Sequence, residues 1–135
     1  MMRSILYLSV DNVLEVHRRV IEGFGGDFGL RDRGLLESAV ALPYASFGGT
    51  ELHLSLPAKA GAYHFHLCSN QAFVDGNKRV AVAASELFLL LNGLELQAED
   101  SALEELTFGV AQGSVAKEQV LAFFAENTKK AGPSV

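Results

Sequence analysis

The sequence has little of what marks secreted, disulfide-stabilised or membrane proteins. Its 135 residues include one cysteine, Cys68, so no disulfide can form within the chain, as is typical of a protein in a reducing cytoplasm. The first residues lack the basic and then apolar pattern of a secretion signal. The longest apolar stretch, residues 80–91, is too short to cross a bilayer and contains Glu86. We therefore expect a cytoplasmic protein that does not associate with a membrane.

Basic residues are also scarce. Eleven Lys and Arg stand against 16 Asp and Glu, which gives a formal net charge of −5. This balance argues against broad nucleic-acid binding, although it leaves room for a local basic pocket. The chain is 49% hydrophobic and long enough for one domain with a proper core. We expect that single domain over residues 1–127 and a disordered tail over residues 128–135.

Helical patterns fill most of the chain. Capping residues and apolar spacing predict helices over about residues 9–21, 32–40, 55–69, 77–91, 101–111 and 114–124. Their expected N-caps include Ser9, Asp32 and Ser55, then Ser101 with Glu104 as a capping box, and Ser114. Residues 44–54 have few helix formers and predict an exposed loop or short hairpin, either a binding loop or a plain connector. The sum is an all-α domain of about six helices with one small β-hairpin.

The most informative stretch joins the two central helices and reads Phe73-Val74-Asp75-Gly76-Asn77-Lys78-Arg79. A turn explains Asp75 and Gly76, because glycine tolerates positive φ. It does not explain Lys78 and Arg79, since cations are unfavourable at the start of a helix. A phosphate bound there would meet free backbone N–H groups, the helix dipole and both cations. The stretch predicts an anion-binding cradle; the alternative, a capped turn without a ligand, leaves the cations unexplained.

Three of the histidines and the cysteine are residue types that can bind metal ions. His64 and Cys68 share one face of their predicted helix while His66 points away, so the three cannot converge on one metal ion. His17 falls on the apolar stripe of the first helix, which predicts a partly buried structural histidine.

The stretch over residues 71–79 resembles the central motif of the Fic/Doc superfamily, His-x-Phe-x-Asp/Glu-Gly-Asn-Gly/Lys-Arg, at every position except the first. Lys78, where the adenylylating branch usually has glycine, resembles the death-on-curing branch. Residues 29–39 look like that branch's N-terminal signature, and Leu-Asn-Gly at residues 91–93 fits it as well. The resemblance covers roughly residues 6–124, nearly the whole chain.

The resemblance implies an all-helical toxin of a toxin–antitoxin system, which transfers a group from ATP to a protein hydroxyl with Mg²⁺. In the death-on-curing branch the group is a phosphoryl, the target is elongation factor Tu and an antitoxin protein neutralises the toxin in trans; Fic enzymes transfer AMP. By position, Asp75 would hold Mg²⁺, Gly76 and Asn77 would form the phosphate cradle, and Lys78 and Arg79 would neutralise phosphate charge. Phe73 would anchor the loop, and residues 44–54 would be a flap that aligns the target as an added strand.

The motif's histidine, the general base of the family, is replaced here by Gln71. A neutral amide cannot hold a transferred proton near pH 7, and a general base typically contributes about 10²–10⁴-fold in rate. We therefore expect an intact pocket with weak or absent transferase activity. Gln71 is either a natural degeneration or an inactivating change, and the alternative function is a non-catalytic module that binds nucleotide or protein.

The sequence also lacks the self-restraining helix of many Fic proteins, Ser/Thr-x-x-x-Glu-Gly/Asn. Glu22 and Glu126 are followed by a suitable residue, but Arg18 and Ala122 stand four positions before them. We expect any restraint to come from a separate antitoxin chain.

Overall fold

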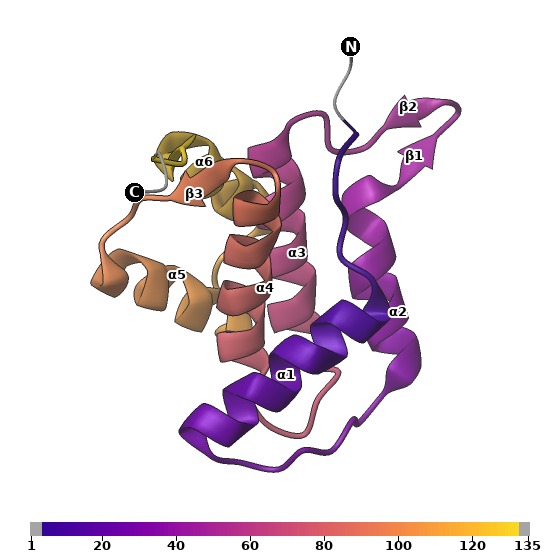
Figure 1. The fold of residues 1–135 in the computed structure, drawn as a ribbon, viewed down its shortest axis with the longest axis vertical. Coiled ribbons are helices and arrows are strands. Elements are labelled where there is room, and N and C mark those ends of the chain that lie inside the picture. Colours follow the sequence, from indigo (N-terminus) through magenta and orange to yellow (C-terminus); the bar gives the residue numbers. More distant parts are fainter. Residues whose placement is uncertain (1–3, 133–135) are drawn as a thin grey trace.

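Two helices joined by a short loop, α3 (Leu56–Asn70) and α4 (Asn77–Leu91), form the centre of the computed structural model, which describes residues 4–132 (Figure 1). Around them lie α1 (Val10–Phe24), α2 (Arg33–Ala41), α5 (Asp100–Gln112) and α6 (Lys117–Asn127). A 3-10 turn, η1 (Leu42–Tyr44), leads into the strands β1 (Ser46–Phe47) and β2 (Thr50–Glu51), while β3 (Leu94–Leu96) and β4 (Thr128–Lys130) form a second small sheet. The predicted all-α domain of about six helices is confirmed. No helix in residues 4–132 has the length and apolar character needed to span a membrane.

Helix α3 is central because its small residues let other helices approach closely. A Cβ added to Gly61 would lie 2.8 Å from the Leu121 side chain and 3.4 Å from its Cα, so α6 crosses α3 at this glycine. The larger side chains of α3 fill the space on its other faces. Tyr63 is fully buried, and its hydroxyl accepts a hydrogen bond from the Leu8 amide at 2.9 Å, which fixes the N-terminal segment on the core.

Three of the five predicted N-caps are confirmed. The side chains of Ser9, Asp32 and Ser55 each accept a hydrogen bond from a backbone amide three residues later. The prediction for α5 was wrong: the helix begins at Asp100 after Glu99, so Ser101 lies inside the first turn and forms no capping box with Glu104.

The prediction for α6 was also wrong. Ala116 is its N-cap, whereas Ser114 donates from its hydroxyl to the Gly109 carbonyl at 3.2 Å. Ser114 therefore completes the end of α5 and does not start α6.

One of the two small sheets confirms a prediction, and the other contradicts one. The hairpin expected in residues 44–54 is confirmed, with Ser46 opposite Glu51 and Phe47 opposite Thr50. The disordered tail is wrong for Thr128–Lys130, which forms β4 antiparallel to β3, followed by a hydrogen bond from the Ala131 amide to the Gly93 carbonyl. The partner strand lies more than 30 residues earlier, beyond the reach of a local pattern. The rest of that prediction, residues 133–135, lies outside the described residues.

Candidate functional site

The candidate site is the loop between α3 and α4, and it starts from a constrained residue. Gln71 follows the last turn of α3 with φ 49° and ψ 51°, and among the described residues it is the one non-glycine with positive φ. Such residues concentrate at functional sites, and Asn, Asp and His adopt this conformation more readily than other side chains. Arg31 fixes the turn, because its guanidinium donates to the carbonyls of Gln71 at 2.8 Å and Asn70 at 3.2 Å. A cation at a helix C-terminus also offsets its partial negative charge.

The segment before α2 supports the loop from one side. The amides of Arg31 and Asp32 both donate to the Ala72 carbonyl, at 2.7 and 3.0 Å, and the Val74 amide donates to the Gly29 carbonyl at 3.0 Å. The structure therefore places the two stretches with the family resemblance, residues 29–39 and 71–79, against each other.

Helix α1 also contacts the loop, through the His17 side chain. Phe73 is 2% exposed and stacks on the His17 ring, with centroids 3.8 Å apart and planes 7° apart. His17 Nε2 donates to the Asp75 carbonyl at 2.9 Å. The predictions that His17 is a structural histidine and that Phe73 anchors the loop are confirmed, because both side chains are buried and hold the loop in place.

The side chain of Asn77 closes the loop. Its Oδ1 accepts from the Phe73 amide at 3.0 Å, and its Nδ2 donates to the Phe73 carbonyl at 2.9 Å. Gly76 has φ 84°, and a Cβ there would lie 3.2 Å from the Ile21 side chain, so glycine is strongly favoured at this position. Asn77 can thus offer a ligand its backbone N–H, while its side chain is committed to the loop.

The first turn of α4 presents donors and charge together. The amides of Asn77, Lys78 and Arg79 have no acceptor among residues 4–132, and the first bonded amide of the turn is Val80, which donates to the Gly76 carbonyl at 2.9 Å. Lys78 and Arg79 are exposed and form no ion pair within the described chain. Free N–H groups, the positive end of the dipole and two cations therefore meet at one point, which suits an anion.

Asp75 is exposed at the edge of this loop and is held by one oxygen. Its Oδ2 accepts from the Asp27 amide at 2.7 Å, which leaves Oδ1 without a protein donor among the described residues. Gly26 makes this approach possible, because a Cβ there would lie 3.1 Å from the Asp75 Cβ, and its φ of 120° also favours glycine. A carboxylate with one fixed and one free oxygen matches the hard oxygen ligands that Mg²⁺ requires.

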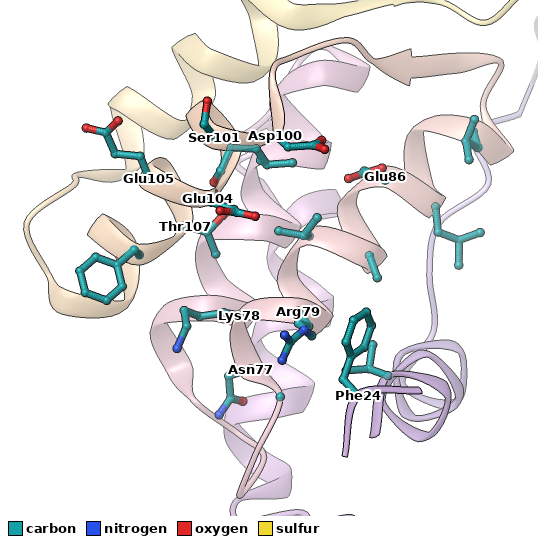
Figure 2. Close-up of a pocket in the computed structure, with 18 residues that line it drawn as sticks. Phe24, Asn77, Lys78, Arg79, Glu86, Asp100, Ser101, Glu104, Glu105 and Thr107 are labelled. Carbon is teal, nitrogen blue, oxygen red and sulfur yellow. Dashed lines mark hydrogen bonds between the residues drawn. The ribbon is translucent and has the colours of Figure 1, made fainter. Parts of the chain in front are cut away.

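A cavity of about 1220 Å³ opens from the first turn of α4 toward α5. Residues 76–79 form one end, where Arg79 lies 4.2 Å above the Phe24 ring, and Figure 2 shows the carboxylates of Glu86, Asp100 and Glu104 toward the other end. Burial, with a smaller contribution from Asp100, raises the pKa of Glu86.

Four of the predicted site residues line this cavity, namely Gly76, Asn77, Lys78 and Arg79. Gln71 and Asp75 are not part of its lining.

The β1–β2 hairpin is tethered to the core by a buried lysine. Lys59 of α3 is 1% exposed. Its ammonium donates one hydrogen bond to the His53 carbonyl and another to Glu51 Oε1, the latter at 3.1 Å. The ammonium also lies 5.7 Å from the centroid of the Tyr7 ring. At the free end of the hairpin Phe47 is 82% exposed. The segment is thus anchored at its base and exposed at its tip.

His64 and Cys68 face α5 together, as their spacing predicted. His64 Nε2 donates to the Thr107 hydroxyl at 2.9 Å, and the Cys68 thiol contacts the Thr107 carbonyl at 3.5 Å. Burial lowers the pKa of His64 to about 4 and raises the pKa of Cys68 to about 11. Both are therefore uncharged packing groups near neutral pH.

Sequence reasoning missed Phe24, Asp27, Arg31 and Lys59. Lys59 had a visible signal, a cation in the apolar, alanine-rich start of α3. The glycines around Phe24 and Asp27 signalled a turn, but nothing local indicated that it would pack on residue 75.

Comparison with known proteins gives two kinds of match. The sequence model described as the Fic/DOC family matches residues 7–89. Toxin Doc of Mycolicibacterium smegmatis is 47% identical over 76 residues, which cover 56% of this chain and 58% of that relative. Protein kinase doc of Escherichia phage P1 is 27% identical over 114 residues, which cover 84% of this chain and 89% of the phage protein.

Proposed function

The chain belongs to the Fic/DOC family, and on that premise we propose that it is a Doc-type toxin, built to use ATP and Mg²⁺ to modify a protein hydroxyl and impaired in the transfer step by Gln71. The observation that carries the proposal is the first turn of α4, where, within residues 4–132, three backbone amides have no acceptor and two cations form no ion pair. Phosphoryl and nucleotidyl transfer depend mainly on positioning and charge stabilisation, which such a turn supplies.

The nucleotide would place its phosphates at this turn. Phosphate oxygens would accept from the amides of residues 77–79, while Lys78 and Arg79 would offset their charge. The carboxylates of Glu86 and Asp100 toward the other end of the cavity would repel phosphates, which favours one orientation of the ligand.

Asp75 is the residue that would hold Mg²⁺. Mg²⁺ is usually bound by one or two carboxylates together with substrate phosphates, and the free Oδ1 of Asp75 supplies one such ligand. The ion would neutralise charge on the phosphates. The hydrogen bond from the Asp27 amide orients the carboxylate before the nucleotide arrives.

The transferred group would be a phosphoryl and the acceptor a hydroxyl of a protein, with elongation factor Tu as the target that the family resemblance implies. The name of the phage relative, Protein kinase doc, supports phosphoryl over AMP. Lys78, in place of the glycine of the adenylylating branch, supports the same choice. Such a toxin would act in the cytoplasm, where its substrates are found.

An antitoxin protein would restrain the chain in trans. The Mycolicibacterium smegmatis relative is named Toxin Doc, and residues 4–132 contain no helix with the self-restraining pattern Ser/Thr-x-x-x-Glu-Gly/Asn. Expression of the Gln71→His variant alone and together with a candidate antitoxin would test this partner, and we expect growth arrest only when the variant is expressed alone.

Gln71 is where the reaction would stop. Its amide can orient an incoming hydroxyl by hydrogen bonding, but it cannot take the proton that leaves when the new bond forms. The left-handed backbone at this position suits histidine at least as well as glutamine, so Gln71→His should leave the loop unchanged.

The test is a transfer assay with γ-phosphate-labelled ATP, Mg²⁺ and elongation factor Tu. We expect Gln71→His to raise labelling by about 10²–10⁴-fold over the present chain, with Gln71→Ala as the control that stays inactive. Adding Asp75→Asn to Gln71→His should remove the gain. The second candidate function is a non-catalytic module that binds nucleotide, and the absence of a general base at Gln71 supports it. A Gln71→His variant that binds ATP but stays inactive would favour this second candidate.

A further inference from the structure

We propose that Phe24 is a positioning residue, whose ring holds the Arg79 guanidinium beside the phosphate cradle and leaves its N–H donors free. The inference rests on the proposed function, because it deepens the account of how the anion site is built. Neither the motif nor the flap includes Phe24.

The starting observation is an aromatic side chain that does not belong to the core. Phe24 is the last residue of α1, is 67% exposed and stands between Gly23 and Gly25. Its ring instead receives the Arg79 guanidinium, 4.2 Å from the ring centroid (Figure 2). A cation at that distance over an aromatic face is held by the ring quadrupole.

A carboxylate is the alternative partner for an arginine in this cavity, and it would compete with a phosphate for the same N–H donors. Glu86, Asp100 and Glu104 line the same cavity, yet none of the ion pairs in residues 4–132 includes Arg79. A carboxylate would neutralise the guanidinium and occupy its in-plane donors. A ring contacts the flat face and leaves those donors available for two phosphate oxygens.

Helix α1 places the ring with the same face that supports the loop. His17 donates to the Asp75 carbonyl, and Ile21 and Val20 lie 3.2 and 3.5 Å from where a Gly76 Cβ would be. Phe24 follows on this face, three residues after Ile21 and seven after His17. One helix face thus contacts residues 75 and 76 and then the side chain of Arg79, so the guanidinium is fixed relative to the cradle.

A phosphate-only ligand separates this role from direct stacking of Phe24 on a nucleotide base. The experiment measures binding of Mg²⁺–tripolyphosphate and of Mg²⁺–ATP to the full chain by calorimetry. We expect Phe24→Leu to weaken tripolyphosphate binding by about 3- to 10-fold, and Phe24→Tyr, which keeps the ring, to stay within about 2-fold. Phe28→Leu is the matched control, since Phe28 is also an exposed aromatic beside a glycine but does not line the cavity.

A double-mutant cycle supplies the decisive readout. In an Arg79→Gln background, Phe24→Leu should cause no further loss of tripolyphosphate binding, because the ring acts through the guanidinium. An equal loss in both backgrounds, or a loss seen with ATP but not with tripolyphosphate, would overturn the inference while the anion site stands. A parent chain that binds neither ligand would overturn the proposed function and this inference with it. Thermal unfolding of each variant checks that the exposed substitution leaves the fold intact.

Discussion

Two lysines on neighbouring helices have opposite surroundings. Lys59 on α3 is 1% exposed, and its ammonium has a carbonyl, a carboxylate and an aromatic ring around it. Lys78 on α4 is exposed and has no anionic partner in the described chain. The buried Lys59 thus has partners that offset the cost of burying its charge, whereas Lys78 lies at a helix start, where the helix dipole disfavours a cation, and has none in the described chain. An unpaired cation at a helix start is informative because a structural role does not account for it.

The largest effect should come from breaking the buried side of this comparison. Lys59→Ala removes a buried side chain and leaves the His53 carbonyl without its donor, so we expect unfolding to become easier by about 2–4 kcal/mol. Chemical denaturation measures this, and amide exchange in residues 46–51 should rise as the hairpin loosens. The matched substitution Lys78→Ala should change stability by less than about 0.5 kcal/mol. Equal losses from the two substitutions would remove the distinction.

His64 is a buried titratable group without a charged partner, and it should make the stability of the fold depend on pH. The pKa of His64 falls to about 4 in the folded chain because of burial, below the usual value of 6.5. As pH falls, the His64 side chain of the unfolded chain therefore binds a proton before that of the folded chain does. The free energy of unfolding is unaffected by this group above about pH 6.5 and decreases from there toward pH 4. The shift corresponds to about 3 kcal/mol. Denaturation midpoints of the chain and of His64→Gln, measured from pH 7 to pH 4, should differ in slope; parallel curves would contradict the assignment.

The loop itself offers a residue that belongs to the structural side despite its place in the motif. Asn77→Ala removes both hydrogen bonds to the Phe73 backbone, so we expect a loss of about 1–3 kcal/mol in unfolding free energy. Asn77→Asp keeps the acceptor for the Phe73 amide and should lose less. A stability unchanged by Asn77→Ala, combined with lost ATP binding, would assign the side chain to the ligand.

The smallest effect on stability, and a clear one on binding, should come from Lys78. Lys78→Ala leaves the fold alone but removes a charge-assisted contact to phosphate, so we expect Mg²⁺–ATP to bind about 10-fold more weakly. Calorimetry at two salt concentrations measures it, and Lys129→Ala, on the β4 strand, is the control. An unchanged affinity would place the phosphates away from this turn.

Much of this molecule could be predicted from the sequence because its signals are local. Helical spacing of apolar residues and three side-chain caps placed the helices within a few residues. Gly76 followed by Lys78 and Arg79 predicted a turn and then a helix start, which the structure shows, and the anion cradle expected there stays a prediction. Each of these depends on residues within about one or two helical turns, where backbone geometry links sequence position to position in space.

Only the tertiary structure decided which distant groups meet. Arg31 reaches the carbonyl of Gln71, the Asp27 amide reaches Asp75, and β4 pairs with β3, all across more than 30 residues of sequence. The same holds for Phe24 and Arg79, which a local pattern cannot connect because their contact depends on how α1 crosses α4. Propensity and periodicity act along the chain, whereas these pairings depend on the packing of elements, which a single sequence without its fold leaves open.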